Sequence, residues 1–153
     1  MSGSARGMDK GLAVILVAAM GGLIAAQAPI NGHLGEHVGK FPAALISFIG
    51  GTVLLTLIVV ISGEGLGRVS GSGLPWYYFI GGLLGAAYIS TVIFTVGTLG
   101  AGGITAATIA GQLTAAVALD HFGALGLEQQ AITTQRLAGV LLLAAGTYLV
   151  VAD

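Results

Sequence analysis

The 153-residue chain contains no cysteine and very little charge. Lysine, arginine, aspartate and glutamate together make up 7% of the residues, whereas soluble domains carry about 25% charged residues. So few charged side chains cannot cover the outside of a water-soluble fold, and 56% of the residues are hydrophobic. Most of the protein surface must therefore face lipid. The absence of cysteine excludes disulfide bonds, cysteine-bound metals and cysteine nucleophiles.

Neither sign of charge is in excess, because the formal net charge is −1. The chain therefore lacks the basic surface that nucleic-acid binding requires. His33 and His37 have the i,i+4 spacing of metal ligands on a helix, but no third ligand accompanies them. No motif places a nucleophile beside a base. We predict no metal, no cofactor, no nucleic-acid partner and no enzymatic activity.

Long apolar runs are abundant instead. A membrane-crossing helix needs about 20 mostly apolar residues. Five stretches meet this criterion, at about 11–31, 42–62, 76–97, 101–120 and 134–152. We therefore predict an all-α integral membrane protein with five transmembrane helices per chain. Residues 1–9 are interpreted as a tag or a disordered N-terminus, and residues 10–153 as one membrane domain.

Lysine and arginine predict the orientation of these helices, because cytoplasmic loops carry more of them. With five crossings, Lys10, Arg68 and Arg136 lie at the same face as the N-terminus, whereas Lys40 lies alone at the other face. This bias favours a cytoplasmic N-terminus. It rests on so few charges that insertion in both directions is also compatible with the sequence.

Polar side chains inside membrane helices are costly, and they mark solute paths or interhelical hydrogen bonds. Gln27 and Asn31 share one face of the first span, with Pro29 between them, and Gln112 lies near the middle of the fourth. The predicted solute-binding residues are Gln27, Asn31, Tyr88, Thr91 and Gln112. Amide and hydroxyl groups suit a small, polar, uncharged solute better than a lipophilic cation. Alternatively, the threonine hydroxyl bonds to its own backbone and the tyrosine only packs.

Asp120 and His121 stand together at the end of the fourth span. We predict that Asp120 couples or gates transport through its charge and that His121 orients it. The alternative is an interfacial carboxylate whose charge reaches water.

The positions of these polar groups favour an inverted pair of chains. Gln27 and Asn31 lie towards the C-terminal face, and Asp120 and His121 towards the N-terminal face. Two copies in opposite orientation would align the first pair of one copy with the second pair of the other. Inverted repeats around a site at the midplane are the common plan of secondary transporters. We therefore predict an antiparallel dimer that forms a ten-helix unit.

Several segments resemble the YdcZ-like proteins, a five-helix branch of the drug/metabolite transporter superfamily. They include QAPINGHLG (27–35), PWYYFIGGLLGAAY (75–88) and AGQLTAAVALDHFGALGL (110–127), and the resemblance extends over nearly the whole chain after Lys10. It implies a multi-pass protein of the bacterial inner membrane that transports a small molecule. It also implies pairing with an oppositely oriented second copy or paralogue. Many members have a proline where this chain has Gly97.

These observations predict a secondary transporter that works by alternating access as an inverted dimer within membrane lipid. Residues 11–35 contain no acid, although the related small multidrug exporters carry a coupling glutamate in this helix. Two alternatives remain open. An accessory subunit would assemble with another membrane protein and show no activity alone, and a channel would show currents without saturation.

Overall fold

The computed structural model describes residues 9–68 and 73–152, and all of its regular elements in these ranges are helices. In chain order they are α1 (Lys10–Val38), α2 (Lys40–Ser62), η1 (Leu66–Arg68), η2 (Trp76–Phe79), α3 (Gly81–Phe122), η3 (Ala124–Gly126) and α4 (Thr134–Val151). Residues 1–8, nearly all of the segment interpreted as a tag or disordered terminus, lie outside the described part.

Four helical segments of the described residues are long and apolar enough to cross a membrane. The protein is therefore an all-α, multi-pass membrane protein. The sequence predicted five such segments, and the difference arises at one place. The third segment is continuous from Trp76 to Phe122, 47 residues, and it contains both of the stretches expected at 76–97 and 101–120.

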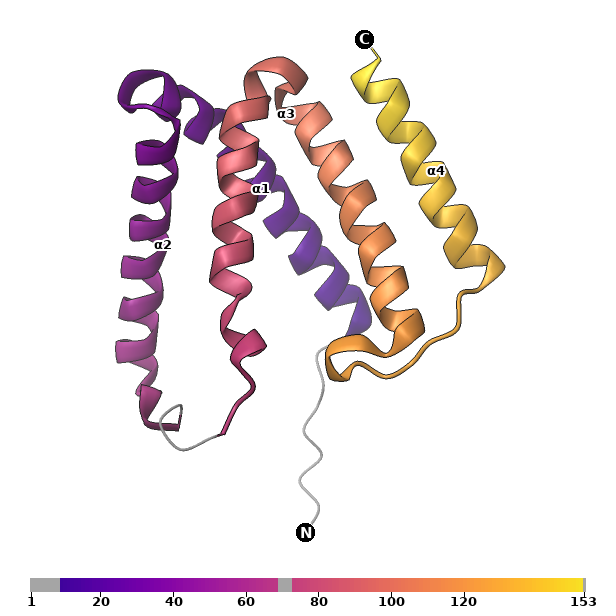
Figure 1. Ribbon diagram of the computed structural model, residues 1–153, viewed down its shortest axis with the longest axis horizontal. Helices are drawn as coiled ribbons and strands as arrows, with labels where there is room; N and C mark the ends of the chain where they lie inside the picture. The colour runs from indigo at the N-terminus through magenta and orange to yellow at the C-terminus, as the bar shows by residue number, and fades with distance from the viewer. Residues whose placement is uncertain (1–8, 69–72, 153) are drawn as a thin grey trace.

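This long segment reverses direction at Gly100. The residue has φ 65° and ψ 172°, which is not helical, and the chain turns back on itself there (Figure 1). The Tyr88 hydroxyl lies 3.2 Å from Thr108 Oγ1, although a straight helix would separate residues 20 positions apart by about 30 Å. We refer to residues 81–99 as the first arm of α3 and to residues 101–122 as the second arm.

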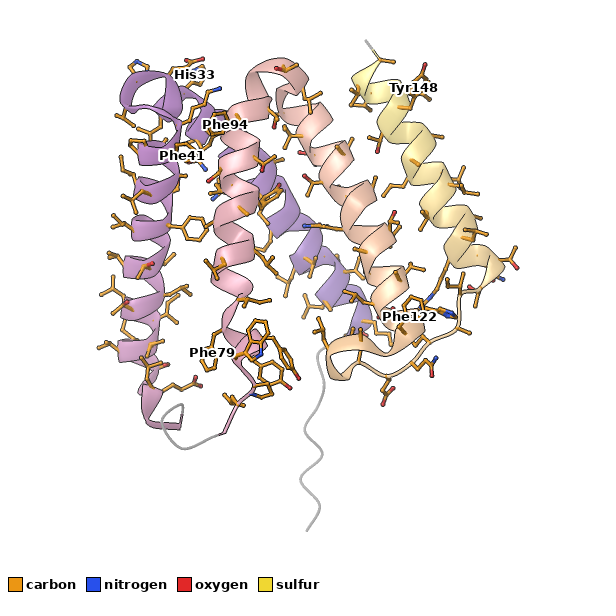
Figure 2. All side chains as sticks on the ribbon, viewed as in Figure 1. His33, Phe41, Phe79, Phe94, Phe122 and Tyr148 are labelled. Atoms are coloured by element: carbon orange, nitrogen blue, oxygen red, sulfur yellow. The ribbon has the colours of Figure 1, made fainter. Side chains whose placement is uncertain are left out.

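The helices form a row with one helix crossing it. α2, the two arms of α3 and α4 stand side by side, and α1 runs obliquely behind them (Figure 1). α1 contacts both α2 and α3, whereas α4 contacts α3 alone among the described helices. Figure 2 shows His33, Phe41 and Phe94 at the end of the row where α3 reverses, and Phe122 at the opposite end. We call these the Gly100 end and the Asp120 end.

The ends of the helices follow from local chemistry. Asp9 Oδ1 accepts the backbone N–H groups of Gly11 (2.8 Å) and Leu12 (3.2 Å) at the start of α1, as an N-cap residue does. Gly39 alone joins α1 to α2, with φ 93°. Gly123 ends α3 in the left-handed conformation (φ 58°), which glycine adopts without steric cost.

Very few side chains are buried within the single chain. One cluster contains Ala43, Ala44, Ile89 and Ile93, and another contains Ala28, Val92 and Ile104. Large apolar side chains are otherwise exposed, and α4 has no buried residue. In lipid this arrangement carries little cost, because acyl chains are as apolar as the side chains that they contact.

Candidate functional site

A cavity of about 260 Å³ lies between α1 and the two arms of α3. Its volume is near the lower end of the range of small-molecule sites, roughly 300–1,000 Å³, so it suits a small solute. Its polar side chains come from all three walls. They are Gln27, Tyr88, Thr105, Thr108 and Gln112.

The reversal of α3 brings two of these polar groups into contact. The hydroxyls of Tyr88 and Thr108 are 3.2 Å apart, and either one can donate the hydrogen bond. Gln112 follows Thr108 by four residues, so it lies on the same helical face one turn further on. Gln27 enters the cavity from α1 on the other side. The site therefore presents two amides and a hydroxyl pair to one space.

A proline in α1 removes one of the helix's backbone hydrogen bonds beside the cavity. Pro29 lies inside the helix and has no N–H to donate to the carbonyl of Ala25, four residues earlier. Ala25 is one of the residues that line the cavity. A backbone carbonyl without its helical partner is a strong acceptor that must be satisfied by another group. A solute that carries a donor would meet this need.

The electrostatic character of the cavity is neutral. None of the residues that line it is an aspartate, glutamate, lysine, arginine or histidine. A permanent charge inside it would lose hydration without gaining a counter-ion, which is costly in a medium of low dielectric constant. The cavity can therefore hold an uncharged molecule through hydrogen bonds, but it offers no ion pair. Among the described residues no group of histidine and carboxylate side chains could bind a metal ion.

Three of the predicted solute-binding residues share this cavity, and two do not. Gln27, Tyr88 and Gln112 line it together. Asn31 instead lies buried between α1 and α2, where its Oδ1 accepts a hydrogen bond from Ser47 Oγ at 2.5 Å. The hydroxyl of Thr91 donates to the carbonyl of Ala87 at 2.9 Å. This is the backbone bond that threonines in membrane helices commonly make.

The predicted set omitted two residues that the cavity contains. Thr105 and Thr108 line it beside Gln112. A signal for both was present in the sequence, since positions 105, 108 and 112 fall on one face of a helix. The Ala25 carbonyl could also have been found, because a proline inside a helix identifies the carbonyl that it leaves free.

Asp120 and His121 lie at the far end of α3 and do not line the cavity. Asp120 Oδ2 is 3.2 Å from Arg136 Nη1, and the two side chains are 31% and 33% exposed. The backbone carbonyl of Asp120 also accepts the N–H of Gln130 at 2.8 Å. Asp120 therefore fastens the loop after α3 and the first turn of α4 to the end of the second arm.

His121 has fewer interactions. Its ring packs edge-on against Phe122, with centroids 5.1 Å apart, and its carbonyl accepts a hydrogen bond from Gln129 Nε2 at 2.9 Å. Its Nδ1 atom is buried without a hydrogen-bond partner among the described residues. The coupling or gating role of Asp120 and His121 stays a prediction.

Residues 12–149 match the family described as "Putative inner membrane exporter, YdcZ". Because the match covers most of the chain, the protein belongs to this family. No curated protein and no solved structure matches the chain. The family and the apolar helices together define a multi-pass inner-membrane protein of a transport class, and the resemblance seen in the sequence is confirmed. The family description names transport and no catalytic activity.

Proposed function

We propose that the protein is a secondary transporter of a small, polar, uncharged solute, and that the cavity between α1 and α3 is its binding site. The observation that carries this proposal is the composition of the cavity. Gln27, Tyr88 and Gln112 converge in it without any charged neighbour, in a family described as an exporter. A lipophilic cation would find neither a carboxylate nor a cage of aromatic rings there.

We further propose that the chain crosses the membrane five times, with each arm of α3 as one crossing. The arms of 81–99 and 101–122 each have about the 20 residues that a crossing needs. α1 begins at the Asp120 end of the row of helices and α4 ends at the Gly100 end (Figure 1), which agrees with an odd number of crossings. Lys10 and Arg136 are then at the Asp120 end and Lys40 at the Gly100 end.

The working unit in this proposal is an inverted dimer. A five-crossing chain is half of a ten-helix transporter built from inverted repeats. Lys10, Arg68 and Arg136 lie at the Asp120 end and Lys40 at the Gly100 end, so the bias that sets orientation rests on very few positive charges. The two orientations are therefore close in energy. Alternating access would expose the cavity to one side of the membrane and then to the other.

A thermal-shift screen on the purified protein tests the binding site. The panel contains neutral amides and polyols, zwitterionic amino acids and tetraalkylammonium cations. We expect a neutral solute to raise the unfolding temperature, and Gln112→Leu to abolish that shift because it removes an amide from the cavity. Gln135→Leu is the matched control, since Gln135 is exposed at the start of α4.

Counterflow in proteoliposomes then distinguishes the function classes. A transporter exchanges the solute across the membrane with saturation. Unsaturable currents would identify a channel, and binding without exchange would favour an accessory subunit. In the thermal-shift screen, stabilisation by the cations alone would contradict the proposed site. So would an equal loss of the solute-induced temperature shift in Gln112→Leu and Gln135→Leu.

A further inference from the structure

A second pocket, of about 390 Å³, lies at the Gly100 end of the row of helices. Its outer wall is polar and includes His33, Glu36, Lys40 and Thr98. His33 Nδ1 is 3.2 Å from Glu36 Oε2, with both side chains exposed, and the ammonium of Lys40 is 4.6 Å from the centre of the Phe94 ring. Charged, exposed side chains place this pocket at the membrane surface, where water enters it.

A layer of apolar side chains separates this pocket from the neutral cavity. Ala28, Val92 and Ile104 are buried, with 4%, 4% and 6% of their surfaces exposed, and all three line the neutral cavity. Val96 packs against them and lines the outer pocket, and Leu99 packs beside it. We call these five residues the plug. Val92 and Val96 are one turn apart, so the two spaces are separated by only about 6 Å along the first arm.

The plug is closed by an unusually close approach of α1 to the first arm of α3. A Cβ atom placed on Gly32 would lie 2.7 Å from Val96 Cγ1, and one placed on Gly35 would lie 2.9 Å from Ile93 Cγ2. Neither separation is possible between real atoms, so the contact exists because both positions lack a side chain. Gly32 therefore forms the surface of α1 that covers the plug at Val96, and Gly35 makes a similarly close contact with Ile93 beside the plug.

The part of α1 that makes this contact lies beyond a weak point in the helix. Pro29 lacks the N–H that would bond to Ala25, and proline inside a helix permits a kink. The segment after it is tied to α2, because Asn31 Oδ1 accepts the hydroxyl of Ser47. The described residues form no hydrogen bond across the plug, which is held by apolar packing alone. The end of α1 can therefore move together with α2 while the first part of α1 stays in place.

We propose that the plug is the gate of the transport path and that the outer pocket is the second mouth of the cavity. This inference rests on the proposed transport function and adds to it the route that the solute takes. In the structure the gate is shut, and the cavity is closed towards the Gly100 end. Opening requires a bend at Pro29 that lifts Gly32 and Gly35 away from Val96 and Ile93.

Single cysteines can test the gate without any solute, because the chain contains no cysteine of its own. Thr98→Cys places a thiol in the outer pocket, and Thr105→Cys places one under the plug. A membrane-impermeant maleimide is added outside proteoliposomes. The extent to which Thr98→Cys is labelled gives the fraction of molecules with the Gly100 end outward.

We expect two labelling phases for Thr105→Cys. The first mouth of the cavity lies at the Asp120 end in this proposal, so molecules with that end outward should react fast. Molecules with the Gly100 end outward react slowly, because the plug must open first. Val92→Ala/Val96→Ala removes buried methyl groups from the plug and should accelerate the slow phase roughly tenfold or more. The matched control Val53→Ala/Val60→Ala truncates two exposed valines of α2 and should leave it unchanged.

A disulfide between α1 and α3 should lock the plug, whereas the alanine substitutions loosen it. The Cβ atom built on Gly32 is 3.9 Å from Val96 Cβ, within the separation of about 3.5–4.5 Å that disulfides have. In Gly32→Cys/Val96→Cys/Thr105→Cys, oxidation should abolish the slow phase, preserve the fast phase and be reversed by reduction. Peptide mass spectrometry measures labelling at position 105 separately from labelling at positions 32 and 96.

Two results would overturn the gate. A single fast phase in every molecule would mean that the plug is not closed. A slow phase that neither the alanine variant nor the disulfide changes would mean that the plug is a fixed core. If the gate fails while a neutral solute still stabilises the protein, the binding site stands without this route. If labelling behaves as expected but no solute binds, the gate stands and the proposed substrate class falls.

Discussion

At the scale of single residues, the placement of polar groups separates two kinds of side chain. Some bond to each other within the chain: Asn31 Oδ1 accepts the Ser47 hydroxyl at 2.5 Å, although the buried Asn31 Nδ2 has no partner among the described residues. Others converge on a shared space, as Gln27 and Gln112 do in the neutral cavity. Buried polar groups are expensive when unpaired, so amides that line a cavity are available for a ligand, whereas an amide in a packed interface serves the fold first.

The ion pair between Asp120 and Arg136 allows a test of the predicted coupling role. Both Asp120→Asn and Arg136→Gln break the 3.2 Å contact, and each should cost roughly 1 kcal/mol or less of stability, because both partners are about a third exposed and such pairs are screened. If Asp120 couples transport to charge, only Asp120→Asn should remove the dependence of counterflow on a pH gradient. If the two variants change the pH dependence of counterflow equally, Asp120 only holds the loop in place and does not couple transport to charge.

At the scale of elements, the reversal of α3 creates the site. The sequence predicted two separate helices, at 76–97 and 101–120, and the structure joins them at Gly100 without a loop. The family position at which many members have proline is Gly97 in this chain, yet the only non-helical residue inside α3 is Gly100. The turn therefore falls three residues beyond the position at which those members have proline.

Substitution of Gly100 tests this account of the turn. Its φ of 65° with ψ of 172° belongs to a region that only glycine enters easily, so Gly100→Ala should destabilise the protein by about 1–3 kcal/mol. Gly97→Ala is the control, because it lies in regular helix with open space around a built Cβ. Thermal unfolding in detergent measures both. Equal stability of the two variants would show that the reversal does not depend on glycine geometry.

At the scale of the whole molecule, the distribution of positive charge bears on assembly. Lys10, Arg68 and Arg136 lie at one end of the helices and Lys40 at the other. The orientation of a chain in the membrane depends on the difference in Lys and Arg between its two sides. In the proposed inverted dimer, where the same chain inserts in both directions, one gene would supply both halves. Because large apolar side chains remain exposed in the single chain, ample surface is available for such a partner.

Charge variants test the inverted dimer directly. Lys40→Gln should fix the Asp120 end in the cytoplasm, and Lys10→Gln/Arg68→Gln/Arg136→Gln, which leaves Lys40 at the other end, should fix the opposite orientation. We expect neither variant to form dimers with itself as efficiently as the unmodified chain does. Differently tagged copies of the two variants should co-purify when they are expressed together. Lys40→Arg, which keeps the charge, is the control, and efficient self-pairing of each fixed variant would favour a parallel dimer.

Local pattern was sufficient for the class of fold and for three of the residues that line the candidate cavity. Composition specifies the solvent, and the length of each apolar run specifies whether it can cross a bilayer. Helical periodicity placed Gln112 on the same face as Thr105 and Thr108, and the structure puts all three in the cavity. Gln27 and Tyr88 were identified because a polar group within an apolar run is conspicuous by itself.

By itself, the sequence determined that lipid is the solvent, that the elements are helices and which polar groups lie within them, because each of these depends only on neighbours along the chain. The tertiary structure alone decided which polar groups meet. Asn31 faces Ser47, Thr91 bonds to its own backbone, and Asp120 is paired with Arg136. These outcomes depend on how each helix is rotated about its axis and on where α3 turns back. In lipid both are set by close packing at a few glycines, such as Gly32 against Val96.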